Sequence, residues 1–478
     1  MHKPVSFTDL CLSFPNKSCF DHFNGQIHCG SRIAIVGRNG AGKSSLLNVV
    51  RGALEPTSGS ISVPDDAVVS YVPQVMDTTD SLSGGQRFHK QLTAALAREP
   101  NVLLLDEPTN HLDRKNRTSL IRMIQGFYGT VIVVSHDTEL LNRCMDTFWH
   151  IDNGAVHEFS GRYDDYIRET YRKRVLLEQK IAELGRQKKN THEALMKEQH
   201  RASRSKSKGE KSIDQKKWPT ITSHAKARRA EQTSGRKQSA INEAKQSLVD
   251  KLADLRLPEV IMPTFSLSAA DLGERTLISV RNGSVGYVGE KPLLAEISLS
   301  LSTKERVVIA GNNGSGKSTL IKGLLSSSEV ITEGDWLTPD RKMIGYLDQH
   351  YTTLPPDDTV LDSIERLVPH WPHAQLRKHL NDFLFRSNEE VNLAVSQLSG
   401  GEKVRLSLAQ IAAKTPRVLI LDEITNNLDL ETKGHVLEVL QRYPGAMMVI
   451  SHDESFLQQL NIDQTYDVSR DFLTVKKI

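Results

Sequence analysis

Two glycine-rich segments of the sequence have the residue types and spacing of a phosphate-binding loop. Residues 37–44 read GRNGAGKS and residues 311–318 read GNNGSGKS, so both match the pattern GxxxxGK[ST]. Glycines in such a loop let backbone N–H groups curl around phosphate oxygens, and the helix that follows presents its N-terminus to the anion. The motif assigns Lys43 and Lys317 to the β- and γ-phosphates, and Ser44 and Ser318 to Mg²⁺.

An acidic pair closes an apolar run in each half of the chain. Residues 102–107 read VLLLDE and residues 418–423 read VLILDE. Ligands of α/β sheets bind beyond the carboxyl ends of buried parallel strands, which such runs predict. We expect the aspartates to hold Mg²⁺ through water and the glutamates to polarise an attacking water molecule. These side chains are Asp106, Asp422, Glu107 and Glu423. Two acids in a surface turn are the alternative, which the upstream phosphate loops disfavour.

The elements that must hold these side chains are also predicted by the sequence. Apolar runs at 32–36 and 306–310 precede the glycine-rich segments as short strands, and helix-like residues follow them. Further runs at 131–134 and 447–450 add a strand to each half. We therefore expect the α/β fold class, with parallel strands and intervening helices.

Two more segments repeat with identical spacing. LSGGQ at 82–86 corresponds to LSGGE at 398–402, and Ser-His-Asp occurs at 135–137 and again at 451–453. From the first signature residue to the Mg²⁺ aspartate is 24 residues in both halves, and from that aspartate to the histidine is 30 in both. Equal intervals across two halves indicate a duplicated domain.

Together these motifs resemble those of the ATP-binding cassette family, over roughly residues 4–160 and 277–478. The signature LSGGQ, between a phosphate loop and an acidic strand, is specific to that family. The resemblance implies two P-loop ATP-binding cassette domains in tandem, joined by an α-helical hairpin linker. It implies ATP and Mg²⁺ as cofactors and hydrolysis of ATP to ADP and phosphate. In the family the cassettes pair head to tail, so that each ATP lies between the phosphate loop of one cassette and the signature of the other.

The resemblance also implies roles for individual residues. Glu107 and Glu423 would be the catalytic bases, and His136 and His452 would contact the γ-phosphate. The nucleotide-contacting positions are the adenine-stacking Phe14 with Gly37, Asn39, Gly40, Gly42, Lys43, Ser44, Ser45, Gln74, Ser83, Gly84, Gly85 and Asp106, and the adenine-stacking Tyr287 with Gly311, Asn313, Gly314, Gly316, Lys317, Ser318, Thr319, Gln349, Ser399, Gly400, Gly401 and Asp422. The Mg²⁺ positions among them are Ser44, Gln74, Asp106, Ser318, Gln349 and Asp422.

The two halves differ in one interval. Eight positions separate Gln74 from the first signature, whereas 49 separate Gln349 from the second signature. The first cassette therefore has little room for the helical subdomain of the family. Helix-like segments at 359–368 and 371–385 fill the corresponding gap of the second cassette.

This difference predicts unequal nucleotide sites. We define site A as the site built on Lys43 and the signature at Leu398, and site B as the site built on Lys317 and the signature at Leu82. Site A is expected to be complete, because its signature belongs to the cassette with the full subdomain. Whether site B hydrolyses ATP is left open by the sequence.

Basic residues concentrate between the two halves. From 172 to 245 the chain has 21 Lys and Arg against 8 Asp and Glu, a net charge of +13, and since the whole chain carries +3, the remainder carries −10. Such a segment suits a polyanionic partner. A solvated linker is the alternative. Trp218 in this segment is either a base-stacking residue or an aromatic packed between helices.

Apolar stripes predict two antiparallel helices in this basic segment. Leu177, Ile181 and Leu184 recur at i, i+4 and i+7 in the first, as in a coiled coil. We expect that helix to cover residues 163–200 and a turn to lie at 201–224. The stripe of the second helix has 7-4-3 spacing and consists of Ile241, Leu248, Leu252 and Leu255.

Composition narrows the class of protein. With 38% hydrophobic and 25% charged residues the chain has a folded composition, and no run approaches 18 apolar residues, so no membrane span is expected. The N-terminus lacks a signal-peptide core. The four cysteines show no CxxC pairing, which argues against a disulfide framework or a zinc module and favours a cytoplasmic location.

Twin cassettes joined by a basic helical hairpin resemble the ABC-F proteins, cytosolic ATPases that bind the ribosome. The resemblance implies that the ATP-bound closed form binds the ribosome and inserts its hairpin into the tRNA exit site toward the peptidyl-transferase centre. The hairpin would there meet ribosomal RNA and P-site tRNA. The first cassette has no room for the arm insertion of the family, which favours an antibiotic-resistance, ribosome-protection member over a housekeeping translation factor.

The expected organisation is a monomer of three parts, whose cassettes pair intramolecularly. These are a first cassette at 1–160 with a much shortened helical subdomain, a helical-hairpin linker at 161–265, and a second cassette at 266–478. Two other classes stay open. One is the ATPase subunit of an ABC transporter with separate membrane subunits, which has no need of a long basic linker. The other is a DNA-repair ATPase, a class that usually carries longer coiled coils or zinc modules.

Overall fold

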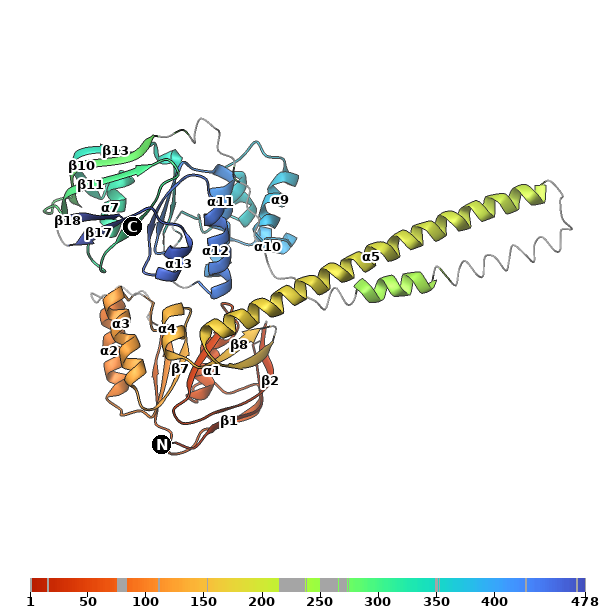
Figure 1. Ribbon diagram of the computed structural model, residues 1–478, viewed down its shortest axis with the longest axis horizontal. Helices are drawn as coiled ribbons and strands as arrows, with labels where there is room; N and C mark the ends of the chain where they lie inside the picture. The colour runs from red at the N-terminus through yellow and green to blue at the C-terminus, as the bar shows by residue number, and fades with distance from the viewer. Residues whose placement is uncertain are drawn as a thin grey trace. The chain divides into compact units, whose positions relative to one another are not determined.

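The computed structural model divides the chain into two compact units, of which the first contains both predicted cassettes. One unit comprises Met1–Tyr166 and Val260–Ile478, and the other comprises Ile167–Glu259. Figure 1 shows the helices and strands of both units. The residues that the structure describes are 2–14, 17–74, 84–110, 112–152, 154–214, 237, 239–249, 265, 273, 275–348, 351, 353–425, 428–469 and 472–477.

The first half is built on a six-stranded sheet beside a smaller antiparallel sheet. All neighbours in the large sheet are parallel except its last pair. In spatial order the large sheet contains β5 (Val69–Val72), β6 (Val102–Asp106), β7 (Thr130–Val134), β3 (Arg32–Gly37), β8 (Thr147–Asp152) and β9 (Ala155–Ser160), and the small sheet contains β2 (Lys17–Ile27), β1 (Val5–Phe14) and β4 (Ser58–Ser62). The helices are α1 (Lys43–Val50), α2 (Gly84–Leu96), α3 (Arg114–Gly126) and α4 (Thr138–Cys144).

The second half repeats this topology. Its large sheet again has parallel neighbours except for the last pair. In spatial order it contains β14 (Ile344–Leu347), β15 (Val418–Asp422), β16 (Ala446–Ile450), β12 (Arg306–Ala310), β17 (Gln464–Ser469) and β18 (Phe472–Lys477), and the small sheet contains β11 (Leu294–Ser302), β10 (Thr276–Tyr287) and β13 (Val330–Leu337). The helices are α7 (Lys317–Leu324), α8 (Val360–Glu365), α9 (His373–Asp382), α10 (Asn388–Asn392), α11 (Gly400–Lys414), α12 (Leu430–Arg442) and α13 (Glu454–Gln459).

Alternate residues of the central strands explain why these sheets are covered on both faces. Leu103 and Leu105 of β6 belong to a core shared with α2, α3 and α4, whereas Val102 and Leu104 belong to a core shared with α1 and the small sheet. The strand β15 divides in the same way between two cores. A strand with two buried faces reads as a continuous apolar run, which is why the sequence predicted it. The α/β prediction is confirmed.

The interval that distinguishes the two halves holds three helices in the second. There α8, α9 and α10 lie between β14 and α11, and apolar residues such as Leu376, Leu380 and Phe383 pack them into the core. The predicted helices at 359–368 and 371–385 are thus confirmed as α8 and α9. In the first half only residues 73–83 separate β5 from α2, and 75–83 lie outside the described residues.

The first helix of the basic segment is longer than predicted. The helix α5 runs over Tyr163–Asp214, 52 residues, or about 78 Å at 1.5 Å per residue (Figure 1). The predicted turn at 201–224 is therefore wrong for residues 201–214. These residues are rich in Ser, Lys and Gly, but lysine, arginine and glutamate favour helix, and one glycine costs only about 1 kcal/mol. Residues 215–224, with Trp218, lie outside the described part of the chain.

A second helical stretch follows at residues 239–249, as the second stripe predicts. In α5 the stripe residues Leu177, Ile181 and Leu184 are half-buried. Ile241 and Leu248 lie in the second stretch, whereas Leu252 and Leu255 lie outside the described residues. Among the described helices, none is both long and apolar enough to cross a membrane.

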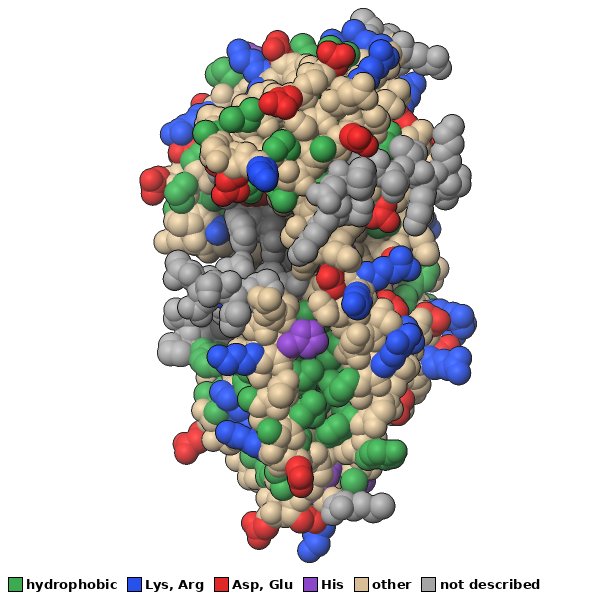
Figure 2. Space-filling view, turned by 90° about the vertical axis from the view of Figure 1, so that its left-hand side faces the viewer, with side chains coloured by type: hydrophobic (Ala, Val, Ile, Leu, Met, Phe, Trp, Pro, Cys, Tyr) green, Lys and Arg blue, Asp and Glu red, His purple; other side chains and the backbone are tan. Residues whose placement is uncertain are grey.

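One face of the molecule carries side chains of both charges. On the face drawn in Figure 2, described basic and acidic side chains are interspersed, with apolar side chains between them. The basic excess of the sequence is thus concentrated in the segment that holds α5.

Candidate functional site

The phosphate loop of the first half has a backbone that only glycine adopts without strain. Gly37 has a φ of 146°, and a Cβ atom on it would lie 2.5 Å from the carbonyl oxygen of Ile151. Gly42 has a φ of 100° and begins α1 in the left-handed region. Gly311 and Gly316 repeat these angles at 149° and 102°. The N-termini of α1 and α7 thus have the geometry of an anion site.

A buried lysine lies in each loop. Lys43 donates through Nζ to the carbonyl oxygens of Gly37 at 2.8 Å and Arg38 at 3.0 Å. Lys317 donates to the carbonyls of Gly311 at 2.9 Å and Asn312 at 3.0 Å. Burial lowers the pKa of both ammonium groups, because it removes water from the charged form. The loop carbonyls carry only partial negative charge. The full negative charge of a terminal phosphate would therefore stabilise the two ammonium groups better.

Serine and aspartate meet where the predicted Mg²⁺ site requires them. Ser44 donates through its hydroxyl to Asp106 Oδ1 at 3.1 Å, and Tyr71 donates to Oδ2 of the same carboxylate at 3.2 Å. Burial raises the pKa of Asp106, and both hydroxyls oppose that shift. The donors are oxygens, as Mg²⁺ prefers, so the residues fit the metal.

The second half has the same tyrosine contact. Tyr346 donates to Asp422 Oδ2 at 3.4 Å, and burial raises the pKa of Asp422 to about 6. Sequence reasoning missed both tyrosines as positioning residues. The available signal was their repetition three residues before each predicted nucleotide-contacting glutamine, Gln74 and Gln349.

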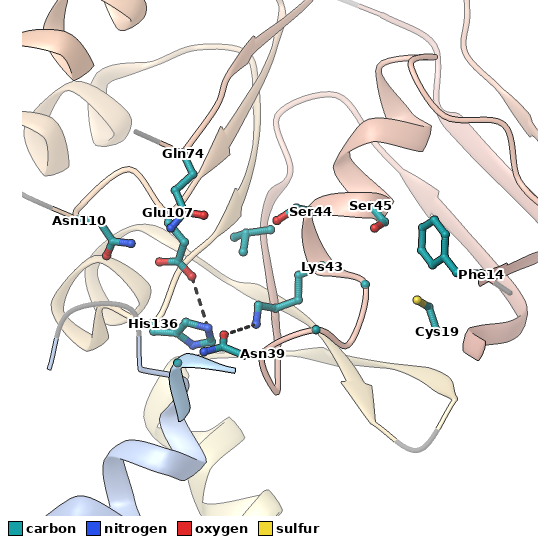
Figure 3. Close-up of a pocket in the computed structure, with 14 residues that line it drawn as sticks. Phe14, Cys19, Asn39, Lys43, Ser44, Ser45, Gln74, Glu107, Asn110 and His136 are labelled. Atoms are coloured by element: carbon teal, nitrogen blue, oxygen red, sulfur yellow. Dashed lines mark hydrogen bonds and ion pairs between the residues drawn. The ribbon is translucent and has the colours of Figure 1, made fainter. Parts of the chain in front are cut away.

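Glu107 and His136 form a buried pair in the first half. Glu107 has a φ of 45°, uncommon for a residue with a side chain, and its N–H donates to the carbonyl of Val134 at 2.8 Å. Its Oε1 lies 3.3 Å from Nε2 of His136 (Figure 3). Burial raises the pKa of Glu107 to about 8 and lowers that of His136 to about 3. Both shifts have the same cause and favour the uncharged forms of the two side chains.

The corresponding pair of the second half is more open. Glu423 has a φ of 51°, and its Oε1 lies 3.7 Å from Nε2 of His452. The two side chains are 20% and 18% exposed, against 11% and 8% for Glu107 and His136. Burial lowers the pKa of His452, whose Nε2 also lies 3.2 Å from Oδ1 of Asn313.

A cavity of about 410 Å³ joins these groups of the first half. Phe14 and Cys19 line one side of it, and Glu107 and His136 line the other (Figure 3). Its size lies within the usual range for small-molecule sites. The lining residues are Phe14, Cys19, Asn39, Gly40, Gly42, Lys43, Ser44, Ser45, Gln74, Glu107, Asn110, Val134 and His136 from the first half, and Gly400 from the second.

Gly400 brings the signature of the second half to this cavity. It is the first residue of α11, and Ser399 caps that helix in a capping box with Glu402. The loop of the first half also contacts the second half directly. The N–H of Asn39 donates to Asp429 Oδ2 at 2.9 Å, and Arg38 pairs with Glu431 at 2.6 Å. The structure therefore combines one phosphate loop with the opposite signature, as the resemblance implies for site A.

The remaining predicted residues take the following places. Gly311, Asn313, Gly314 and Gly316 form the second loop, and Lys317, Ser318 and Thr319 begin α7. Tyr287 ends β10 with the ammonium of Lys322 5.4 Å from its ring centre, Gly84 and Gly85 begin α2, and Gly401 follows Gly400 in α11. Ser83 and Gln349 lie outside the described residues, as does the first signature residue Leu82.

Cys19 is a cavity-lining residue that sequence reasoning did not find. It lies in β2, and its side chain is so close to the loop that a Cβ on Gly42 would be 2.9 Å from the Cys19 Cβ. Its only signal was its position five residues after Phe14.

Comparisons with known proteins agree with this geometry. The profile of the family described as ABC transporter matches residues 20–75, 69–110 and 294–426. The ribosome protection protein VmlR of Bacillus subtilis is 29% identical, over 96% of this chain and 86% of its own length. The ATP-binding protein Uup of Buchnera aphidicola is 27% identical over 95% of this chain and 79% of its own. A Haemophilus influenzae protein named probable ATP-binding protein YheS is 28% identical over 95% and 77%.

The fold, the repeated loops and the family matches define an ATPase of the ATP-binding cassette class. The similarity to these relatives continues through both halves and the segment between them. With its two cassettes and the segment between them, the chain resembles the ABC-F family of twin-cassette ATP-binding proteins.

Proposed function

We propose that this protein is a ribosome-protection ATPase, which binds the ribosome in its ATP-bound closed form. The observation that carries the proposal is the likeness to a ribosome protection protein over 96% of this chain, including the basic segment. In this proposal the segment around α5 enters the tRNA exit site and points toward the peptidyl-transferase centre. Its partners are ribosomal RNA and P-site tRNA, and its location is the cytoplasm, where ribosomes work.

The charge of α5 supports a polyanionic partner. Most of its described basic side chains are exposed: nine of them, against four exposed acidic side chains among the described residues of the same helix. Contacts to several phosphates give a steep dependence on salt. The exposed basic residues are Arg168, Arg172, Lys173, Lys180, Arg186, Lys189, Lys197, Arg201 and Arg204.

The proposal gives the site residues the following work. ATP binds between the phosphate loop of one cassette and the signature of the other. Bound ATP therefore favours the closed arrangement of the two cassettes, and hydrolysis lets them separate. Ser44 and Asp106 hold Mg²⁺, which neutralises phosphate charge, and Glu107 and His136 act on the attacking water and the γ-phosphate. The second cassette uses its corresponding residues. The cassettes at 1–160 and 266–478 belong to one monomer and flank the linker at 161–265.

Co-sedimentation with ribosomes in ATP tests the proposal. A Glu107→Gln, Glu423→Gln double variant should bind ATP without hydrolysing it and should pellet with ribosomes. The matched control adds Arg186→Glu, Lys189→Glu and Lys197→Glu, which reverse charges of α5 and should abolish pelleting at moderate salt. Failure of the double variant to pellet, or equal pelleting by the control, would contradict the proposal.

Growth under a panel of translation inhibitors separates resistance from a housekeeping role. Cells that express the protein should grow at higher concentrations of at least one inhibitor than cells that express the α5 control variant. A growth defect without inhibitor on removal of the gene, and no change in sensitivity, would favour the housekeeping role instead.

We propose further that the two nucleotide sites turn over unequally. Glu107 and His136 are closer together and less exposed than Glu423 and His452. A water molecule is activated best where bulk water is excluded and the base is fixed. Glu107→Gln should therefore lower total turnover more than Glu423→Gln. Equal losses would refute this inequality.

A further inference from the structure

A buried arginine of the first cassette contacts the histidine segment of the second. Arg117 lies in the first turn of α3, and its side chain is 10% exposed. One guanidinium nitrogen donates to Asp137 Oδ1 at 2.6 Å, and the other donates to the backbone carbonyl of His452 at 2.9 Å. One side chain thus joins the residue after His136 to the backbone that carries the other predicted histidine.

The position of Arg117 is fixed by its own cassette. Asp137 caps α4, accepting from the N–H groups of Glu139 at 2.9 Å and Leu140 at 3.1 Å. The carboxylate of Glu139 lies 3.3 Å from the same guanidinium nitrogen. A planar guanidinium held by carboxylates on one side has its remaining N–H groups aimed in a set direction. That direction is toward the carbonyl of His452.

The duplicated position carries a different cation. Lys433 of α12 lies four residues after Asp429, as Arg117 lies four residues after Asp113. Lys433 donates to Asp453, the counterpart of Asp137 in its own cassette. An ammonium lacks the fork geometry that lets one group bind a carboxylate and a distant carbonyl in fixed directions. The two halves therefore differ in the side chain that faces the opposite histidine segment.

We propose that Arg117 is a positioning residue for His452, and that it couples turnover at site B to contact between the cassettes. The inference rests on the proposed role of His452 at the γ-phosphate. The ring of His452 is more exposed than that of His136 and lies farther from its glutamate. The side chain of His452 is therefore held less tightly by its own cassette. The hydrogen bond from Arg117 to the His452 carbonyl adds a constraint from the opposite cassette. When the cassettes separate, this bond is lost.

Site-resolved ATPase kinetics test the inference. Glu107→Gln leaves site B as the active site, and Glu423→Gln leaves site A. Into each background Arg117→Lys is introduced, which keeps a charge for Asp137 but removes the fork. We expect kcat at site B to fall about 10- to 100-fold, as for a small displacement of a catalytic group, with KM unchanged within about twofold. Turnover at site A should stay within about twofold, which also shows that the variant folds and closes.

Lys433→Arg is the matched control and should leave both sites within about twofold. Equal losses at sites A and B would make Arg117 a general interface residue and overturn the proposal, as would an unchanged site B. Failure of the proposed function is seen separately. In that case the Glu107→Gln and Glu423→Gln variants would retain full turnover before Arg117 is changed. The proposed roles of the site residues would then be wrong, and the inference about Arg117 with them.

Discussion

Ionisation of Glu107 should make the nucleotide-free protein less stable as the pH rises, and replacing Glu107 should remove this effect. Burial raises the pKa of its carboxyl from 4.5 to about 8. The folded state therefore keeps a proton that the unfolded chain releases between these two values. The stability that this proton confers is complete below pH 4.5 and is lost as the pH rises through about 8. Glutamine has the shape of the neutral acid and does not titrate.

The magnitude follows from the linkage between pKa and stability. Each pH unit within this window changes the free energy of unfolding by about 1.4 kcal/mol, and the whole window by about 5 kcal/mol. For a domain of this size that is about 3 to 5 °C in Tm per pH unit. The difference in Tm between Glu107→Gln and the wild type should therefore grow with pH in the variant's favour, then level off above about pH 8.

The assay is thermal unfolding of nucleotide-free protein at about pH 5, 6, 7 and 8 in matched buffers. Subtracting the wild-type curve removes the titration of every other group. Glu107→Ala is the control, because it removes the same acid but also packing contacts. It should show the same slope with pH from a lower starting value. A difference in Tm that does not change with pH would refute the reasoning.

Three further outcomes are expected from the site. Gly37→Ala places a methyl group against a carbonyl, so it should weaken ATP binding and lower the free energy of unfolding by about 1–3 kcal/mol. Gly126→Ala, with open space around it, is the control and should do neither. Nucleotide titration measures the binding, and denaturant unfolding measures the stability. Tyr71→Phe removes a hydrogen bond to Asp106, the proposed Mg²⁺ ligand, and should raise the Mg²⁺ concentration for half-maximal ATPase by about fivefold; no change would exclude this role. In a Glu423→Gln background, kcat/KM should rise about tenfold per pH unit up to about pH 8, where Glu107 ionises; a plateau already at about pH 6 would contradict a protonated base.

The phosphate loops and the buried strands were predictable, because their geometry requires particular residue types at fixed spacings. A loop that wraps a phosphate needs glycine where φ is positive, and the angles of Gly37 and Gly42 in the structure meet that need. A strand buried on both faces needs an unbroken apolar run, and β6 and β15 have one. Such constraints act within a few residues, so they leave a pattern in the sequence that can be read directly.

Contacts between distant segments left a much weaker pattern, such as the repetition of Tyr71 and Tyr346, or none. Tyr71 reaches Asp106 across 35 positions, and Arg117 reaches His452 across 335. Nothing in the residues near Arg117 distinguishes it from other basic residues of an amphipathic helix. The end of α5 was misplaced for a different reason, because serine and glycine weaken a helix by too little to end one by themselves. Propensity alone therefore predicts the presence of a helix better than its length.

The two halves share their predicted catalytic residues and differ where they contact each other. Arg38 pairs with Glu431 beside site A, whereas the corresponding positions beside site B are Asn312 and Lys115, which cannot form that pair. This ion pair is partly exposed and contributes at most about 1 kcal/mol, so it biases the contact without locking it. The asymmetry therefore lies in the contacts that each nucleotide site makes with the opposite cassette. We expect nucleotide at site A to govern closure through the loop that carries Arg38, and site B to respond to closure.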